Sequence, residues 1–360
     1  MGSNTLTDQK GRLREDIMEA LVAEIAALAK AGNQVVVVSS GAISCGLGML
    51  PIKGRPTDTV ELQATSAVGQ GQLYHRYTEL FDHAGVTTAQ ILLTSYDIAA
   101  RSQYLNARNT LLKLLDWGIV PIINENDTTS ADEIRYGDND FLAAQVAILI
   151  KADLLMLLTD TDGLYTSDPS TDPGASLVEE VTDCSLLDRI DAGGTGSAIG
   201  SGGMKSKIVA AEMAITANIE VVIANGSRPG VITAIAAGEK VGTRFCPLES
   251  TMSSFKLWLK YGRPSAGAIV VDEGAANALK RRGKSLLPAG IVRVEGHFDA
   301  GEALDVFYRK DGRHLVGKGI TSYSSEELRR IKGMKSQQVI KLMPQGEAEA
   351  IHRDYFVLAE

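Results

Sequence analysis

The sequence predicts an α/β fold with a largely parallel sheet, followed by a small β-rich domain. From residue 1 to about residue 247, short apolar runs alternate with longer helix-like segments, which is typical of a parallel sheet. The strand candidates are almost entirely apolar, as expected where helices cover both faces of a sheet. Beyond residue 268 the elements become shorter and mostly strand-like. These three observations together favour two domains.

The elements of the first domain follow from hydrophobic patterning. Strands are predicted at residues 34–38, 87–93, 119–123, 154–158 and 220–223. Helices are predicted at residues 14–31, 61–81, 97–116, 141–150 and 206–217. The Ala, Leu and Ile spacing in the first of these helices fits a helix that packs on a sheet.

The chain changes character between residues 245 and 267, where Pro247, Pro264, Trp258 and a Ser/Thr cluster occur. We interpret this segment as a connector that partly packs. The predicted organisation is therefore a first domain at 1–247, a linker at 248–267 and a small domain at 268–350. In the small domain, strands are predicted at 269–271, 291–294 and 303–308, and helices at 273–282 and 325–332.

Composition narrows the class of protein. With 360 residues and 44% hydrophobic residues the chain can bury a large core, and its net charge of −8 argues against a general nucleic-acid binder or a protein held on anionic membranes. Cys45, Cys184 and Cys246 are too scattered for a disulfide framework or a zinc site, which favours a reducing cytosol. No apolar run approaches the ~20 residues that a membrane helix needs, and we expect no signal peptide.

Polar residues follow one predicted strand abruptly. The apolar run 119–123 stops at Asn124, Glu125, Asn126 and Asp127, and a second polar cluster at 137–140 precedes the helix 141–150. Ligands of open α/β sheets bind outside the carboxyl ends of the strands. These clusters therefore predict a site for a small charged substrate or a magnesium-bound phosphate. The structural alternative is a favourable charge in the first turn of a helix, for Asp140 in particular.

Three further segments have an anion-binding character. The glycine-rich stretch 193–207 ends in Lys205 and Lys207 before a helix, which favours a phosphate site over a flexible loop, although it is not a Walker A motif. Ser40 and the glycines after it form either a backbone cradle for an anion or an ordinary turn. Thr159 and Asp160 end a strand and either hold a nucleotide or form a turn. The dispersed histidines disfavour a histidine-based nucleophilic mechanism.

Taken together, these motifs resemble the glutamate 5-kinases of the amino acid kinase family almost end to end. SSGAISCG, LNARNTL, PIINEND, GDND, LLTDTDGLY and GSGGMKSK occur in the family's order. The tail, with VDEGAANAL, SLLPAGI and YSSEELRRI, resembles the PUA domain of bacterial members. The implied fold is a three-layer αβα sandwich with a mostly parallel central sheet, plus a small β-rich PUA-like domain.

The resemblance implies transfer of the γ-phosphoryl group of ATP to the side-chain carboxylate of L-glutamate, which gives L-glutamyl 5-phosphate, the first step of proline biosynthesis. It places Lys207 at the transferring phosphoryl group and Asp140 as the organiser of the catalytic lysines. Glutamate binding is implied for Ser40, Asp127 and Asn139, with Asn124 as a weaker candidate. ATP binding is implied for Thr159, Asp160, Ser201, Gly202, Gly203, Met204, Lys205, Ser206 and Lys207. The resemblance also implies Mg²⁺ carried mainly by ATP, feedback inhibition by proline, a homo-oligomer and a cytoplasmic location.

The sequence departs from the family at its start. Members begin with a strand that ends in Lys-x-Gly-Ser/Thr, and that lysine contacts the phosphates. Here Gly2 and Thr5 keep the end of the motif, but Met1 stands directly before it, and Lys10 lies beyond the glycine turn. We therefore expect the first strand and its lysine to be missing, through a late start codon or a truncation, and we expect weak kinase activity.

Three other functions compete with this interpretation. A kinase for aspartate, carbamate or acetylglutamate is disfavoured by the PUA-like tail and by the paired motifs. RNA binding through that tail is also disfavoured, because residues 266–360 carry 15 Lys+Arg against 13 Asp+Glu, a net of only +2. The third alternative is a poorly active form that still binds glutamate or proline.

Overall fold

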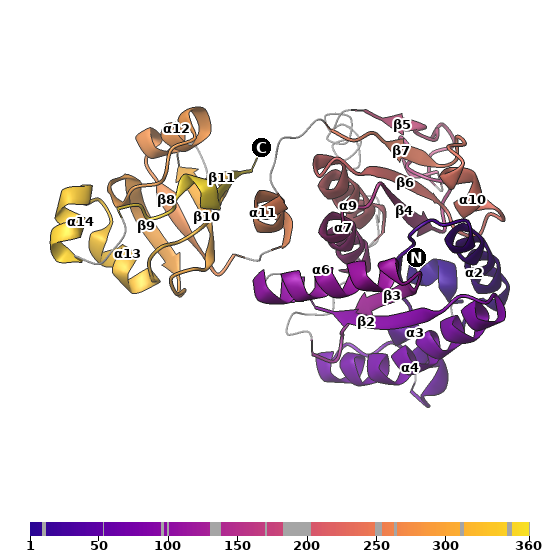
Figure 1. Ribbon diagram of the computed structural model, residues 1–360. Coiled ribbons are helices and arrows are strands. Elements are labelled where there is room, and N and C mark those ends of the chain that lie inside the picture. Colours follow the sequence, from indigo (N-terminus) through magenta and orange to yellow (C-terminus); the bar gives the residue numbers. More distant parts are fainter. Residues whose placement is uncertain are drawn as a thin grey trace. The chain divides into compact units, whose positions relative to one another are not determined.

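The computed structural model describes residues 1–8, 12–52, 54–94, 97–98, 101–129, 138–169, 171–182, 203–248, 254–262, 265–309, 313–343 and 348–359. The chain divides into two compact units, Met1–Thr251 and Met252–Glu360 (Figure 1).

The strands of the first unit form two sheets whose pairing is mostly parallel. One sheet has the order β1-β3-β2, with β1 at Val37–Val38, β3 at Val120–Glu125 and β2 at Thr88–Leu93. The other has the order β4-β6-β7-β5, with β4 at Leu154–Thr159, β6 at Glu220–Asn225, β7 at Thr243–Phe245 and β5 at Glu180–Val181. Only β6 and β7 run antiparallel among these described pairs. The predicted strand 34–38 is reduced to two residues, Val37–Val38, which pair with β3.

The first residues of the chain connect the two sheets. The Met1 nitrogen donates to the Val38 carbonyl at 2.9 Å, and the Ser40 N–H donates to the Met1 carbonyl at 3.1 Å. On the other side, the Gly2 N–H donates to the Leu158 carbonyl at 3.2 Å. Residues 1–2 therefore lie between the carboxyl ends of β1 and β4, and these ends share one edge of the fold.

Helices cover both faces of the sheets (Figure 1). They are α1 (Ser3–Leu6), α2 (Glu15–Lys30), α3 (Ala42–Met49), α4 (Thr59–His83), α6 (Arg101–Asp116), α7 (Asp138–Ile150), α9 (Met204–Thr216) and α10 (Val231–Ala236). Helix α7 contacts both α6 and α9, whereas α2 contacts both α4 and α10. This layering is the predicted αβα sandwich. Helix α7 begins three residues earlier than predicted, which brings Asp138, Asn139 and Asp140 into its first turn.

The second unit is a five-stranded sheet with short helices. The sheet order is β12-β11-β10-β8-β9. Its strands are β8 (Gly267–Val271), β9 (Ile291–Gly296), β10 (Ala303–Arg309), β11 (Arg313–Ile320) and β12 (Phe356–Leu358). Its helices are α11 (Ser254–Leu257), a π-helical turn (Trp258–Gly262), α12 (Glu273–Arg282), α13 (Ser325–Ile331) and α14 (Ser336–Leu342). Strands β11 and β12 and helix α14 were not predicted. The connector packs through Trp258, which is 3% exposed.

Within the described ranges, the structure contains no helix with both the length and the apolar character to cross a membrane.

Candidate functional site

The carboxyl end of β3 carries a buried asparagine that is held on both sides. Asn124 is 3% exposed. Its Oδ1 accepts a hydrogen bond from the Glu125 N–H at 2.9 Å, and its Nδ2 donates to Gln70 Oε1 on α4 at 2.6 Å. Because a buried carboxamide is costly to leave unpaired, these two bonds fix the orientation of Asn124.

Asp127 lies three residues further on and also contacts α4. Ser66 Oγ donates to Asp127 Oδ2 at 2.5 Å. Burial raises the pKa of the Asp127 carboxyl, while the Ser66 hydrogen bond and the charge of Arg55 act in the opposite direction. A half-buried carboxylate in this position can receive a positively charged group from a ligand.

The first turn of α7 brings Asn139 beside the end of β3. The Glu125 N–H, which already donates to Asn124 Oδ1, also lies 3.3 Å from Asn139 Oδ1. One backbone N–H is therefore shared by the two predicted substrate asparagines. We call Asn124, Asp127 and Asn139 the β3 cluster. Asn139 directly precedes Asp140 in the same helical turn, so this cluster lies next to Asp140.

Asp140 joins α7 to the start of α9. Lys207 Nζ lies 3.0 Å from Asp140 Oδ2, and Ser206 Oγ donates to the same carboxylate oxygen at 2.7 Å. The side chains of Lys207 and Asp140 are only 7% and 14% exposed. Gly203 occupies the N-cap of α9 and provides no side-chain cap. The first N–H groups of α9 and the Lys207 ammonium thus form a positive end suited to a phosphate.

The remaining predicted residues lie at the ends of β1 and β4. Ser40 follows β1, and its neighbour Ser39 hydrogen-bonds through Oγ to the buried Tyr77 hydroxyl at 2.9 Å. Thr159 is 8% exposed at the end of β4, and its hydroxyl donates to Asp160 Oδ1 at 3.1 Å. Met204 is half-buried and Lys205 is exposed in the first turn of α9, whereas Ser201 and Gly202 lie outside the described residues.

Two sets of predicted residues therefore occur at the strand ends. The first set is the β3 cluster, and the second set consists of Met204, Lys205, Ser206 and Lys207 at the start of α9. The two sets meet at Asp140, which shares a helical turn with the first and an ion pair with the second. Such an arrangement can place a small charged molecule next to a phosphoryl group.

Sequence reasoning missed Ser66, Gln70 and Tyr77, which α4 contributes. Their contacts cross 61, 54 and 38 positions of sequence. The available signal was their spacing of four and seven residues, which puts all three on one face of the predicted helix 61–81. In the described residues, no three His, Cys, Asp or Glu side chains converge as metal ligands would.

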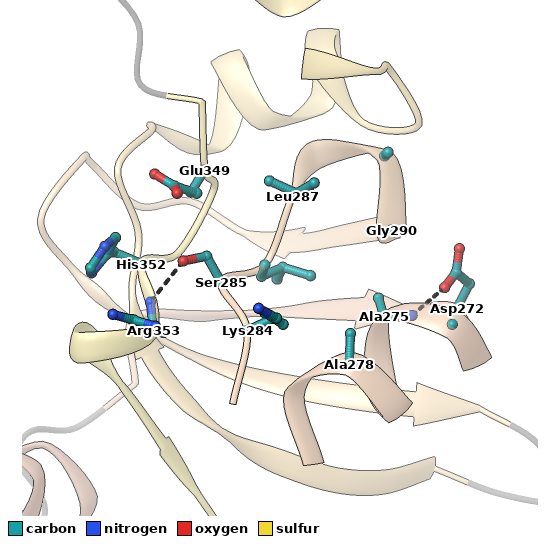
Figure 2. Close-up of a pocket in the computed structure, with 13 residues that line it drawn as sticks. Asp272, Ala275, Ala278, Lys284, Ser285, Leu287, Gly290, Glu349, His352 and Arg353 are labelled. Atoms are coloured by element: carbon teal, nitrogen blue, oxygen red, sulfur yellow. Dashed lines mark hydrogen bonds between the residues drawn. The ribbon is translucent and has the colours of Figure 1, made fainter. Parts of the chain in front are cut away.

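The second unit contains a separate hollow of about 690 Å³ (Figure 2). Ala275 and Ala278 of α12 line it together with Leu287. Figure 2 shows His352 and Arg353 on one side of it and Asp272 on the other. None of its lining residues belongs to the predicted kinase site.

Comparison with known proteins matches each of the two units to a domain family. Residues 1–225 match the model of the amino acid kinase family, and residues 267–343 match that of the PUA domain. A glutamate 5-kinase from Caldanaerobacter subterraneus subsp. tengcongensis is 45% identical over 100% of this chain and 96% of its own length. A glutamate 5-kinase from Moorella thermoacetica is 44% identical over 99% of this chain and 94% of its own length. Among solved structures, the UMP kinase from Bacillus anthracis overlaps 68% of this chain and 93% of its own, with 19% identity and a TM-score of 0.48.

Proposed function

The chain belongs to the glutamate 5-kinase branch of the amino acid kinase family, and we propose that it transfers the γ-phosphoryl group of ATP to the side-chain carboxylate of L-glutamate. The product is L-glutamyl 5-phosphate, which enters proline biosynthesis. The single observation that supports this assignment best is the buried Asp140–Lys207 ion pair, which joins the β3 cluster to the start of α9.

The β3 cluster provides the glutamate site in this proposal. Asp127 gives a countercharge to the substrate's ammonium group, and burial strengthens that interaction. Asn139, in the first turn of α7, and Ser40, after β1, orient the substrate's carboxylates. Because Asn124 is buried and engaged on both sides, we assign it a supporting role for Asn139.

The phosphoryl transfer needs no general base. An oxygen of the side-chain carboxylate is already ionised, and it forms a bond to the γ-phosphorus while the bond to the β,γ-bridging oxygen breaks. ADP takes the electron pair of that bond, and the product is an acyl phosphate. Catalysis therefore consists of positioning and neutralisation of charge. Lys207 neutralises the transferring group, and Asp140 keeps the lysine in place.

The nucleotide lies at the start of α9 in this proposal. The Gly203–Lys207 stretch provides backbone N–H groups and the Lys207 ammonium for the phosphates. Thr159 and Asp160, at the adjacent end of β4, hold the nucleoside part. We propose that Mg²⁺ enters as the complex with ATP, since Mg²⁺ is commonly bound through substrate phosphates and few protein carboxylates. When bound, it would neutralise phosphate charge.

The family resemblance supports three further proposals. Proline inhibits the enzyme at a site that overlaps the glutamate site, the chain forms a homo-oligomer, and it works in the cytoplasm. The full-length match to glutamate 5-kinases favours an active kinase over a non-catalytic glutamate or proline binder.

Trapping of the acyl phosphate with hydroxylamine tests the proposed reaction. With ATP and Mg²⁺, L-glutamate should give hydroxamate with a kcat/KM at least 100-fold above those of L-aspartate and N-acetylglutamate. No hydroxamate from L-glutamate, or equal values for the three acids, would reject the assignment.

A further inference from the structure

One face of α4 carries three polar side chains that all contact residues at strand ends. Ser66, Gln70 and Tyr77 are separated by four and seven residues, which is close to one and two helical turns. Ser66 contacts Asp127, Gln70 contacts Asn124, and Tyr77 contacts Ser39. Ser66 and Tyr77 are nearly fully buried, at 3% and 0% exposed. This helix therefore contacts the ends of both β1 and β3.

The hydrogen bond between Asn124 and Gln70 also bears on Asn139. Gln70 accepts from Asn124 Nδ2, which turns Asn124 Oδ1 toward the Glu125 N–H. That same N–H lies 3.3 Å from Asn139 Oδ1. A change in the Asn124 orientation is therefore transmitted to Asn139 through one shared backbone donor.

Two glycines fix α4 against α3, the helix that follows Ser40. A Cβ at Gly69 would lie 1.9 Å from the Ala42 carbonyl oxygen, and a Cβ at Gly46 would lie 2.0 Å from the Thr65 carbonyl oxygen. The two backbones thus touch directly, with no side chains between them to adjust. Consequently α3, which follows the Ser40 turn, packs directly against the helix that contacts Asn124 and Asp127.

We propose that α4 is the positioning element of the amino-acid substrate site, and that Ser66 and Gln70 determine substrate affinity by holding Asp127 and, through Asn124, Asn139. Neither residue needs to touch the substrate. This inference rests on the proposed function, because that function places glutamate at Asp127 and Asn139. It goes further by naming the residues that set the geometry of the pocket.

Substitutions of Ser66 or Gln70 should affect only the part of the site that binds the amino-acid substrate. Ser66 and Gln70 contact Asp127 and Asn124, whereas Lys207 is held by Asp140 of α7. Loss of a Gln70 or Ser66 contact should therefore weaken glutamate binding and leave ATP binding and the transfer step largely unchanged.

The test compares Gln70→Leu with Gln72→Leu, an exposed glutamine of the same helix. Calorimetry without ATP gives the Kd for L-glutamate, and steady-state kinetics give kcat and both KM values. We expect Gln70→Leu to raise the Kd and the KM for glutamate about tenfold, with kcat and the KM for ATP within about twofold, as for a hydrogen bond that contributes only to binding. Gln72→Leu should match the unmodified chain.

Ser66→Ala removes one hydroxyl group and tests the contact with Asp127 through the pH dependence of the reaction. The Ser66 hydroxyl lowers the pKa of Asp127, as does the charge of Arg55, against the effect of burial. Its removal should shift the acid limb of the pH profile of kcat/KM for glutamate to higher pH. A merely structural role would lower stability without moving that limb, so thermal unfolding is measured alongside.

The outcomes separate this inference from the proposed function. If the unmodified chain binds glutamate but Gln70→Leu and Ser66→Ala bind it equally well, α4 is not the positioning element. A raised KM for ATP or a loss of kcat alone would also overturn the inference. If the unmodified chain neither binds nor phosphorylates glutamate, the proposed function fails first.

Discussion

Asp140 Oδ2 and Lys207 Nζ lie 3.0 Å apart, although 67 positions separate the two residues in the sequence. Both side chains are largely buried, at 14% and 7% exposed. A buried charge is stable only when it is paired, so each residue fixes the other. The pair spans α7 and α9 and thereby aligns the proposed glutamate and nucleotide sites.

Replacing Lys207 with methionine keeps the length of the side chain and removes its charge. We expect kcat to fall about 10²–10³-fold, as when one stabiliser of developing charge is lost. The KM for glutamate should change little, because Lys207 lies outside the β3 cluster. Steady-state kinetics measure both. The exposed Lys240→Met is the matched control and should keep its kcat. A Lys207→Met variant with normal kcat would remove this lysine from the catalytic step.

Asp127→Asn should lose activity yet gain stability at neutral pH. Burial raises the pKa of Asp127 above its ordinary value of 3.8, so the folded state binds that proton more tightly than the unfolded state. The ionised carboxylate therefore costs stability as pH rises above 3.8, and this cost is absent below it. Thermal unfolding of the ligand-free protein should show a higher Tm for Asp127→Asn at pH 7, with a gain that shrinks toward pH 4. An unchanged or lower Tm at pH 7 would contradict this account.

Gly69→Ala and Gly71→Ala form a matched pair on α4. A Cβ at Gly69 would meet the Ala42 carbonyl oxygen at 1.9 Å, whereas nothing lies within 4 Å of a Cβ at Gly71. We expect Gly69→Ala to reduce the free energy of unfolding by about 1–3 kcal/mol. In contrast, Gly71→Ala should raise it by about 0.5–1 kcal/mol, because alanine is the better helix former. Denaturant unfolding measures both, and equal effects at the two positions would refute the close α3–α4 contact.

Glu24 caps α10 from a distant part of the chain. Its carboxylate accepts from the Gly230 and Thr233 N–H groups at 2.9 and 3.0 Å. Glu24→Ala should reduce the free energy of unfolding by ~1 kcal/mol, the usual cost of a lost cap, without altering kcat. The exposed Glu239→Ala is the control in the same denaturant titration. A stability loss of the same size in both variants would show that the cap contributes little.

Hydrophobic patterning predicted the bounds of several elements closely. Strands β2 and β4 begin and end within one residue of their predicted bounds, and α12 matches the predicted helix 273–282. Other elements were missed, including the almost entirely apolar helix α10. Strand β7 has three residues, and β11 begins with three exposed ones, Arg313, His314 and Leu315. Their position in a sheet depends on neighbours that are distant in sequence.

The residues of the candidate site likewise divide into those that the sequence predicted and those that it did not. The polar residues at the end of β3 could be found because they interrupt an apolar strand, and family resemblance supplied their roles. The contacts from Ser66 and Gln70 were missed. Their spacing puts both residues on one face of α4, but a serine and a glutamine in a long helix are ordinary, and their partners lie 61 and 54 positions away in the sequence. Their significance comes from the hydrogen bonds to Asp127 and Asn124, which only the packed fold reveals.

A double-mutant cycle on kcat tests the central claim most directly. It uses Asp140→Asn, Lys207→Met and the double variant, with hydroxamate formation from ATP and L-glutamate as the readout. Because the two side chains act as one unit, the double variant should be about as slow as the slower single variant. Losses that simply multiply would show that Asp140 and Lys207 act independently, and would contradict the account.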